Sequence, residues 1–134
     1  MPTPYQDRRI AAPLVNAENK PFFDAAERGV LLVKRCAACG EHHHYPRAIC
    51  PHCFSDRTEW REARGTGTIY SWSVLRRGVP TPYCLAYVTL DEGVSMLTNI
   101  VDCDLDAIRI GQAVQVRFKP TEDGGPPVPM FSPA

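Results

Sequence analysis

The chain has 134 residues, and its 15 basic and 15 acidic residues give a formal net charge of zero. This length fits one compact domain or two very small units that share an interface. From Trp60 onward the chain holds seven Lys or Arg residues and eight Asp or Glu residues. Because a general nucleic-acid binder depends on a basic face, this balance argues against that class of protein.

Targeting and membrane signals are not evident in the sequence. Residues 1–10 contain no apolar run of signal-peptide length, and no stretch approaches the roughly 20 apolar residues of a membrane span. We therefore expect a cytoplasmic protein with no membrane contact. In such a chain, six cysteines favour metal ligands or free thiols over disulfides.

The N-terminal part predicts an arm, a helix and a strand. Residues 1–16 contain three prolines and little periodicity, which indicates an extended arm. A short helix is expected over Pro21–Arg28, because Pro21 suits a first helical turn and Gly29 suits the position after the last. Val30–Arg35 is typical of a strand and leads directly into a cysteine. The buried face of the helix would hold Phe22, Phe23 and Ala26.

The C-terminal half predicts a β-barrel, because β-rich runs alternate there with turn signals. A short strand at Thr58–Ala63 comes first, and Asp104–Ile108 is expected to be a short helix or turn. The last strand contains a proline, so we expect it at a sheet edge. The barrel strands are expected at Thr68–Arg76, Tyr83–Leu90, Val94–Val101, Ala113–Lys119 and Val128–Phe131, with a hairpin turn at Asp91-Glu92-Gly93.

Five strands with a helix-like insert between the third and fourth match an OB-fold barrel. The predicted fold is mainly β, with an N-terminal helix, a rubredoxin-like zinc ribbon around two Cys-x-x-Cys sequences (residues 36–39 and 50–53) and a C-terminal five-stranded OB-fold barrel. The expected divisions are an arm and helix at 1–29, the zinc ribbon at 30–63 and the barrel at 64–134.

The strongest motif is a pair of CxxC knuckles, Cys36-Ala37-Ala38-Cys39 and Cys50-Pro51-His52-Cys53. Two residues between cysteines let both thiolates of a knuckle reach one ion, and Gly40 permits the tight turn that aims backbone amides at sulfur. Four thiolates at roughly 2.3 Å describe a closed structural zinc site holding one ion. Two disulfides, a rubredoxin-type iron centre and an open catalytic zinc site with three ligands and a water are the alternatives with the same cysteines.

The remaining histidines and cysteines are expected to have structural roles. His42, His43 and His44 lie between the knuckles and His52 lies within the second, so we expect them to face solvent or to support the site rather than to bind metal. Cys84 and Cys103 are expected to act as small buried hydrophobes. No catalytic motif is present, so we expect a protein that is not itself an enzyme.

Several motifs in order resemble one protein family. They are the aromatic helix, the apolar strand into CxxCG, Tyr45-Pro46-Arg47 before CPxC, Gly65-Thr66-Gly67-Thr68-Ile69-Tyr70-Ser71, Leu97-Thr98-Asn99 and Ile110-Gly111. Together they resemble the zinc-ribbon OB-fold proteins associated with acyl-CoA metabolism, long labelled a domain of unknown function. The resemblance covers about residues 21–134. Tyr45, where many relatives carry another aromatic residue or a proline, departs from the pattern.

The resemblance implies a non-catalytic accessory subunit. Members of this family form complexes with thiolase-like enzymes or hydratases, some of which carry out condensation or aldol cleavage on a CoA thioester. It also implies that barrel and ribbon bind acyl-CoA or shape a channel for it. Phosphates and an adenine ring call for arginines and aromatic platforms. The candidate ligand-binding residues are Arg47, Tyr70, Trp72, Arg76, Arg77 and Tyr83.

Two other functions stay open on sequence grounds. Zinc ribbons and OB-folds both serve in single-stranded nucleic-acid binding, with aromatic side chains stacking on bases in a basic groove. Tyr70, Trp72 and Tyr83 could stack in this way, although the second half of the chain is slightly acidic. A free-standing thioester hydrolase is the third alternative. Each of the six candidate ligand residues could equally be a core or solvated side chain.

Overall fold

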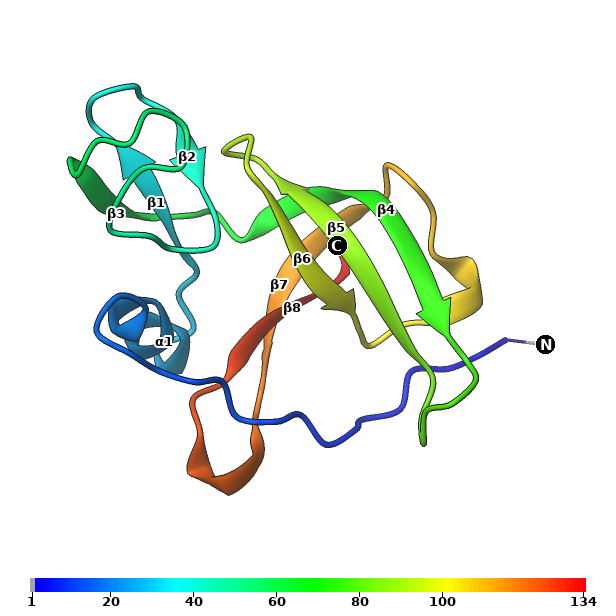
Figure 1. Cartoon of the computed structure of the whole chain (residues 1–134). Helices are drawn as coiled ribbons and strands as arrows, with labels where there is room; N and C mark the ends of the chain where they lie inside the picture. The colour runs from blue at the N-terminus through cyan, green and yellow to red at the C-terminus, as the bar shows by residue number, and fades with distance from the viewer. Residues whose placement is uncertain (1) are drawn as a thin grey trace.

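A small three-stranded sheet, one α-helix and a closed barrel make up the computed structural model, which describes residues 2–134 (Figure 1). The mainly β class, the single N-terminal α-helix and the five-stranded barrel confirm the predicted fold class. None of the described helices is long and apolar enough to cross a membrane. The sheet has the order β2-β1-β3, from β1 (Leu32–Cys36), β2 (His42–His43) and β3 (Thr58–Glu62). The barrel has the order β4-β5-β6-β8-β7, from β4 (Thr66–Leu75), β5 (Tyr83–Leu90), β6 (Ser95–Ile100), β7 (Ala113–Lys119) and β8 (Val128–Pro133).

Helix α1 (Lys20–Glu27) begins one residue before the predicted start, with Pro21 in its first turn. It ends at Glu27, and Gly29, two residues later, has a φ of 75° and donates its amide to the Ala26 carbonyl at 3.0 Å. Its apolar face is buried as predicted, and it includes Phe22 and Phe23. Pro21 and Gly29 were therefore sufficient to predict both ends of this helix to within one residue.

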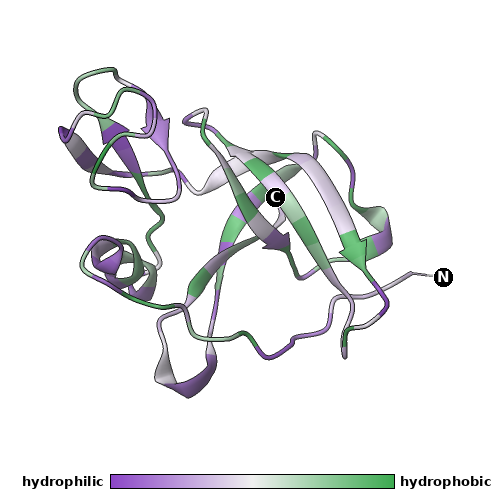
Figure 2. Ribbon diagram, in the orientation of Figure 1, coloured by the Kyte–Doolittle hydropathy of each residue, from purple (hydrophilic) through white to green (hydrophobic). Residues whose placement is uncertain are grey.

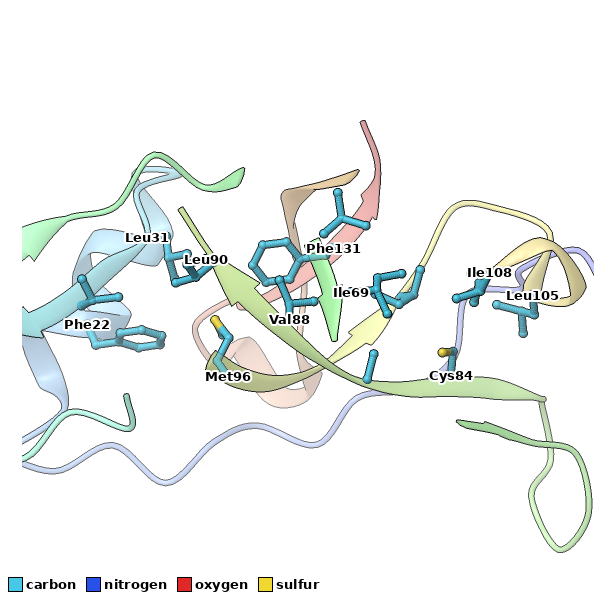
Figure 3. Close-up of a cluster of buried hydrophobic side chains, with 14 of the residues drawn as sticks. Phe22, Leu31, Ile69, Cys84, Val88, Leu90, Met96, Leu105, Ile108 and Phe131 are labelled. Carbon is cyan, nitrogen blue, oxygen red and sulfur yellow. The ribbon is translucent and has the colours of Figure 1, made fainter. Parts of the chain in front are cut away.

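One hydrophobic core runs from the helix through the barrel. Figure 3 shows Phe22 and Leu31 at the helix end, Val88 and Phe131 in the barrel, and Leu105 at the far end. Leu105 belongs to the 3-10 turn η1 (Leu105–Ala107), which lies where a short helix or turn was predicted. Because these side chains form one cluster, the helix end of the molecule and the barrel share one core.

Strand β5 shows why the barrel could be predicted. Its residues alternate strictly between buried and exposed from Cys84 to Val88, so alternate side chains fill the barrel and the others face outward. The β5–β6 hairpin turns at Gly93, whose φ is 92°. Closure comes from pairing of β4 with β7, in which Thr66 lies opposite Gln115.

The prediction that the last strand is an edge strand is wrong. Strand β8 lies between β6 and β7, with Val116 opposite Phe131 on one side and Ile100 opposite Phe131 on the other. The Phe131 carbonyl accepts from the Val101 amide at 2.8 Å, so it points toward β6. Pro129 and Pro133 lie two residues before and after Phe131, so their backbone nitrogens also face β6. Their missing amides are tolerated because only one residue pair joins β8 to β6.

The N-terminal arm is extended, as predicted, and it is attached to the barrel by hydrogen bonds. The Tyr5 amide donates to the Cys103 carbonyl at 3.0 Å, and the Glu122 amide donates to the Ile10 carbonyl at 2.9 Å. Glu122 opens a second 3-10 turn, η2 (Glu122–Gly124). In Figure 1 the arm runs from beside β4 and β5 along the barrel to α1.

Candidate metal centre and ligand cavity

The thiol groups of the two knuckles converge on one point. The Sγ atoms of Cys36 and Cys53 lie 3.6 Å apart, and those of Cys39 and Cys50 lie 3.7 Å apart. All four lie within 4.8 Å of one another. A tetrahedral ion with Zn–S bonds of about 2.3 Å sets its sulfur ligands about 3.8 Å apart. The four cysteines therefore fit one zinc ion, which when bound cross-links the two knuckles.

The first knuckle is arranged to hold a thiolate. Backbone amides of Cys39 and Ala38 donate to the Cys36 sulfur and, against the opposing effect of burial, lower the pKa of that thiol to about 6. Gly40, with φ of 80°, donates its amide to the Cys36 carbonyl at 2.8 Å and closes the turn. The role predicted for this glycine is confirmed by its geometry.

The second knuckle repeats the turn with a phenylalanine in place of the glycine. The Phe54 amide donates to the Cys50 carbonyl at 2.9 Å, as Gly40 does to Cys36. Phe54 has a φ of 66°, a conformation that costs a non-glycine residue about 1–2 kcal/mol. Its side chain is 79% exposed, so little packing offsets that cost.

His43 does not face solvent, which is the first of the two roles expected for the inter-knuckle histidines. His43 is 4% exposed, because it pairs with Lys34 in the sheet rather than lying in a loop. Neither of its ring nitrogens has a hydrogen-bond partner among the described residues. His52 is exposed, as expected. The group of side chains that lie close enough to share one metal ion consists of the four cysteines.

His44 helps to join the ribbon to the helix. Its ring lies 5.6 Å from the Phe22 ring and 5.4 Å from the Tyr45 ring, measured between centroids. The Nδ1 atom is buried without a partner in the described part of the chain, and burial lowers the pKa of the imidazole to about 4. The Tyr45 hydroxyl accepts a 2.8 Å hydrogen bond from Asn19, the residue before the helix. Helix and ribbon thus meet through aromatic side chains.

The six candidate ligand residues do not gather at one place. Arg47 lies on the ribbon, where it pairs with Glu18 at 3.4 Å. Arg76 donates to Thr3 at 3.0 Å and also pairs with Asp106, so it fastens the arm to the end of β4. Tyr70 and Trp72 are exposed on β4, Arg77 is exposed in the loop after it, and Tyr83 starts β5. Their role in ligand binding stays a prediction.

Tyr83 does border a cavity. This cavity, of about 470 Å³, lies between the N-terminal arm and the loop joining β4 to β5. The guanidinium of Arg8 lies over the Tyr83 ring, 4.0 Å from its centroid, and donates to Asn99 Oδ1 at 3.2 Å. The cavity is lined by Asp7, Arg8, Arg9, Val79, Pro80, Thr81 and Tyr83. An arginine held on an aromatic ring beside a cavity can receive an anionic group.

Sequence reasoning missed Arg8 and Asn99. Arg8 stands in an arm without periodicity, 91 positions before Asn99, so nothing local indicates that they meet. The one signal was a cluster of charged residues, Asp7-Arg8-Arg9, in an otherwise uncharged arm. Asn99 belongs to the Leu97-Thr98-Asn99 motif of the family resemblance, and the sequence indicates no role for its side chain.

Comparison with known proteins agrees with this geometry. Two family models match consecutive parts of the chain, the ChsH2 rubredoxin-like zinc ribbon domain over residues 23–59 and the ChsH2 C-terminal OB-fold domain over residues 60–119. The ribbon match and the converging thiolates together identify the metal centre as a one-ion zinc site.

Similar proteins of known name include subunits and scaffold proteins. The chain is 37% identical over 126 residues to a Thermomonospora curvata protein named "Probable enoyl-CoA hydratase alpha subunit", covering 91% of this chain and 39% of that protein. It therefore spans less than half of that relative's length. It is 36% identical over 107 residues to a "DUF35 domain-containing scaffold protein" of Methanothermobacter thermautotrophicus, covering 74% of this chain and 79% of the relative.

A solved structure shares both fold and sequence. The structure titled "Ltp2-ChsH2(DUF35) aldolase" matches with a TM-score of 0.77 and 36% identity, covering 90% of this chain and 98% of the matched chain. On these matches and on its zinc-ribbon and OB-fold geometry, the chain belongs to the DUF35 family, with ChsH2-type domains.

Proposed function

We propose that this protein is a non-catalytic accessory subunit that joins an acyl-CoA-processing enzyme of the thiolase, hydratase or aldolase kind and contacts the acyl-CoA. The Arg8–Tyr83 cavity is the observation that carries the ligand part of this proposal. Names of relatives support the partner part, since they describe a hydratase subunit, a scaffold protein and an aldolase complex.

The cavity suits the nucleotide end of CoA. Its volume of about 470 Å³ lies within the range of pockets that hold small molecules. The guanidinium of Arg8 has five donors, of which one is used in the hydrogen bond to Asn99 among the described residues. Free donors on a fixed guanidinium favour phosphate, which CoA carries at two places.

Partner capture is the test of the subunit part. The full chain is used to recover proteins from an extract of its native cells, and these are identified by mass spectrometry. An acyl-CoA thiolase, hydratase or aldolase is the expected result. Recovery of only ribosomal or polymerase components, resistant to nuclease and moderate salt, would favour the single-stranded nucleic-acid alternative instead.

Titration calorimetry with CoA and dephospho-CoA tests the ligand part. Arg8→Ala is expected to weaken CoA binding about tenfold, the effect of losing one charge-assisted contact. Arg109→Ala is the matched control, because Arg109 is exposed and lies before β7, outside the cavity lining. Equal weakening by both variants, or no binding by the unaltered chain and its complex, would contradict the ligand assignment.

A further inference from the structure

The outer surface formed by β4, β5 and β6 has no charged residues in its strands. None of the three contains Asp, Glu, Lys, Arg or His. Figure 2 accordingly shows β4 and β5 in white and green, whereas strands of the sheet β2-β1-β3 carry purple segments. A sheet face in contact with water normally carries polar and charged residues. Loss of charge from such a face is typical of the centre of a protein interface.

Large apolar side chains are exposed on this surface. Tyr70 is 69% exposed, Tyr87 is 48% exposed and Leu97 is 54% exposed. Tyr87 lies directly opposite Leu97 in the β5–β6 pairing, so these two form one contact area. Leu85, two positions before Tyr87 on the same strand, extends it. We call Tyr70, Leu85, Tyr87 and Leu97 the outer apolar face.

Two serines make a furrow in this face. Ser71 lies opposite Tyr87, and Ser73 lies opposite Leu85, in the β4–β5 pairing. Because serine is much smaller than the residues it faces, the surface is hollowed there. The resulting shallow furrow has a volume of about 280 Å³ and is lined by Ser71, Trp72, Ser73, Leu85, Ala86, Tyr87 and Leu97. Aromatic residues around such a furrow are the side chains that dominate binding energy at protein interfaces.

The face is continuous with the ligand cavity. Tyr83, which lines the cavity, precedes Leu85 by two positions on β5 and so points to the same side of the sheet. Asn99, which holds Arg8, lies opposite Leu85 in the β5–β6 pairing. A protein seated on the outer apolar face therefore comes next to any ligand in the cavity.

We base the choice of occupant on this continuity. We propose that the outer apolar face is the docking surface for the acyl-CoA-processing enzyme subunit, which places an apolar segment in the furrow. The inference rests on the function proposed above and adds its contact surface. A nucleic acid fits less well, because the lining of the furrow offers no cation for phosphate.

The test uses the full chain and the purified enzyme subunit identified by partner capture. Leu97→Asp puts a charge at the centre of the face, and Ile110→Asp puts the same charge on a residue that is 74% exposed and lies outside it. By calorimetry, Leu97→Asp is expected to weaken binding at least about 100-fold. The control is expected to stay within about threefold of the unaltered chain. Zinc content and the melting temperature show that both variants are folded.

A second variant, Tyr87→Ala, removes contact area without adding charge and is expected to weaken binding about tenfold or more. If the folded Leu97→Asp and Tyr87→Ala variants bind the enzyme like the control, the docking surface lies elsewhere, although the accessory-subunit function stands. Dimerisation of the unaltered chain through Leu97, or oligonucleotide binding lost in Leu97→Asp while enzyme binding persists, also overturns the inference. Absence of an acyl-CoA enzyme partner for the unaltered chain refutes both proposals.

Discussion

Replacing His44 by phenylalanine should make the fold less sensitive to acid. The imidazole is packed between Phe22 and Tyr45, and its Nδ1 atom has no partner in the described chain. Burial, with smaller contributions from His43 and Arg47, lowers its pKa from the ordinary 6.5 to about 4. Phenylalanine keeps a ring between helix and ribbon and cannot be protonated.

The magnitude follows from linkage between protonation and folding. A histidine whose pKa is lower in the folded state binds a proton more readily when the protein unfolds. The folded protein therefore has its full stability above the unfolded pKa of 6.5 and loses stability as the pH falls toward 4. With these two values, the free energy of unfolding falls by about 2 kcal/mol between pH 7 and pH 5 through His44 alone. Partial exposure of His44 makes this an upper limit.

Urea unfolding at pH 7 and at pH 5 measures this difference. His44→Phe is expected to lose up to about 2 kcal/mol less stability than the unaltered chain over this interval. Zinc content, determined for both proteins at each pH, ensures that the comparison is between equally loaded ribbons. If the two proteins lose stability in parallel, His44 does not carry the acid sensitivity and the reasoning from its burial is wrong.

Three further substitutions test the structure. Cys39→Ser should lose the zinc and unfold at least the ribbon, since the metal supplies folding energy, and retention of one equivalent by metal analysis would contradict the four-cysteine site. Phe54→Gly should raise the free energy of unfolding by about 1 kcal/mol, because it relieves the positive φ of an exposed residue; an unchanged urea midpoint would show that no strain is stored there. Gly67→Ala should lower it by about 2 kcal/mol, because a Cβ would lie 2.4 Å from the Thr89 carbonyl oxygen. A melting temperature equal to that of the unaltered chain would refute the last.

Local patterns determined how much could be predicted. The alternation from Tyr83 to Leu90 and from Ala113 to Lys119 marked β5 and β7 without error in their bounds. Spacing within the two CxxC knuckles was enough for the metal centre, since each knuckle is a local turn. Each of these features depends on residues that are close together in the sequence, and a single sequence can reveal such local patterns.

Features that depend on distant segments were missed. Strand β8 lies between β6 and β7 because it pairs with both of them, so its prolines alone led to the wrong prediction of an edge strand. His43 is buried because a polar run forms the short strand β2 on β1, which no periodicity indicated. Arg76 and Arg47 look like free cations in sequence, but each meets a carboxylate from far along the chain. The path of the arm over the barrel depends on hydrogen bonds with residues far along the chain, such as that between Tyr5 and Cys103.

That path makes the cavity a composite of two independently variable parts. The family models match residues 23–119, which include Tyr83 and Asn99 but not the arm that delivers Arg8. The arm is bound to the barrel through backbone hydrogen bonds, such as that from Tyr5 to Cys103, and through side chains, such as Arg8 on Asn99. Because the backbone hydrogen bonds do not depend on the side chain at position 8, that side chain can differ while the arm keeps its path. Exchange of this one segment would alter the charge presented to a ligand while leaving the barrel, the ribbon and the outer apolar face as they are.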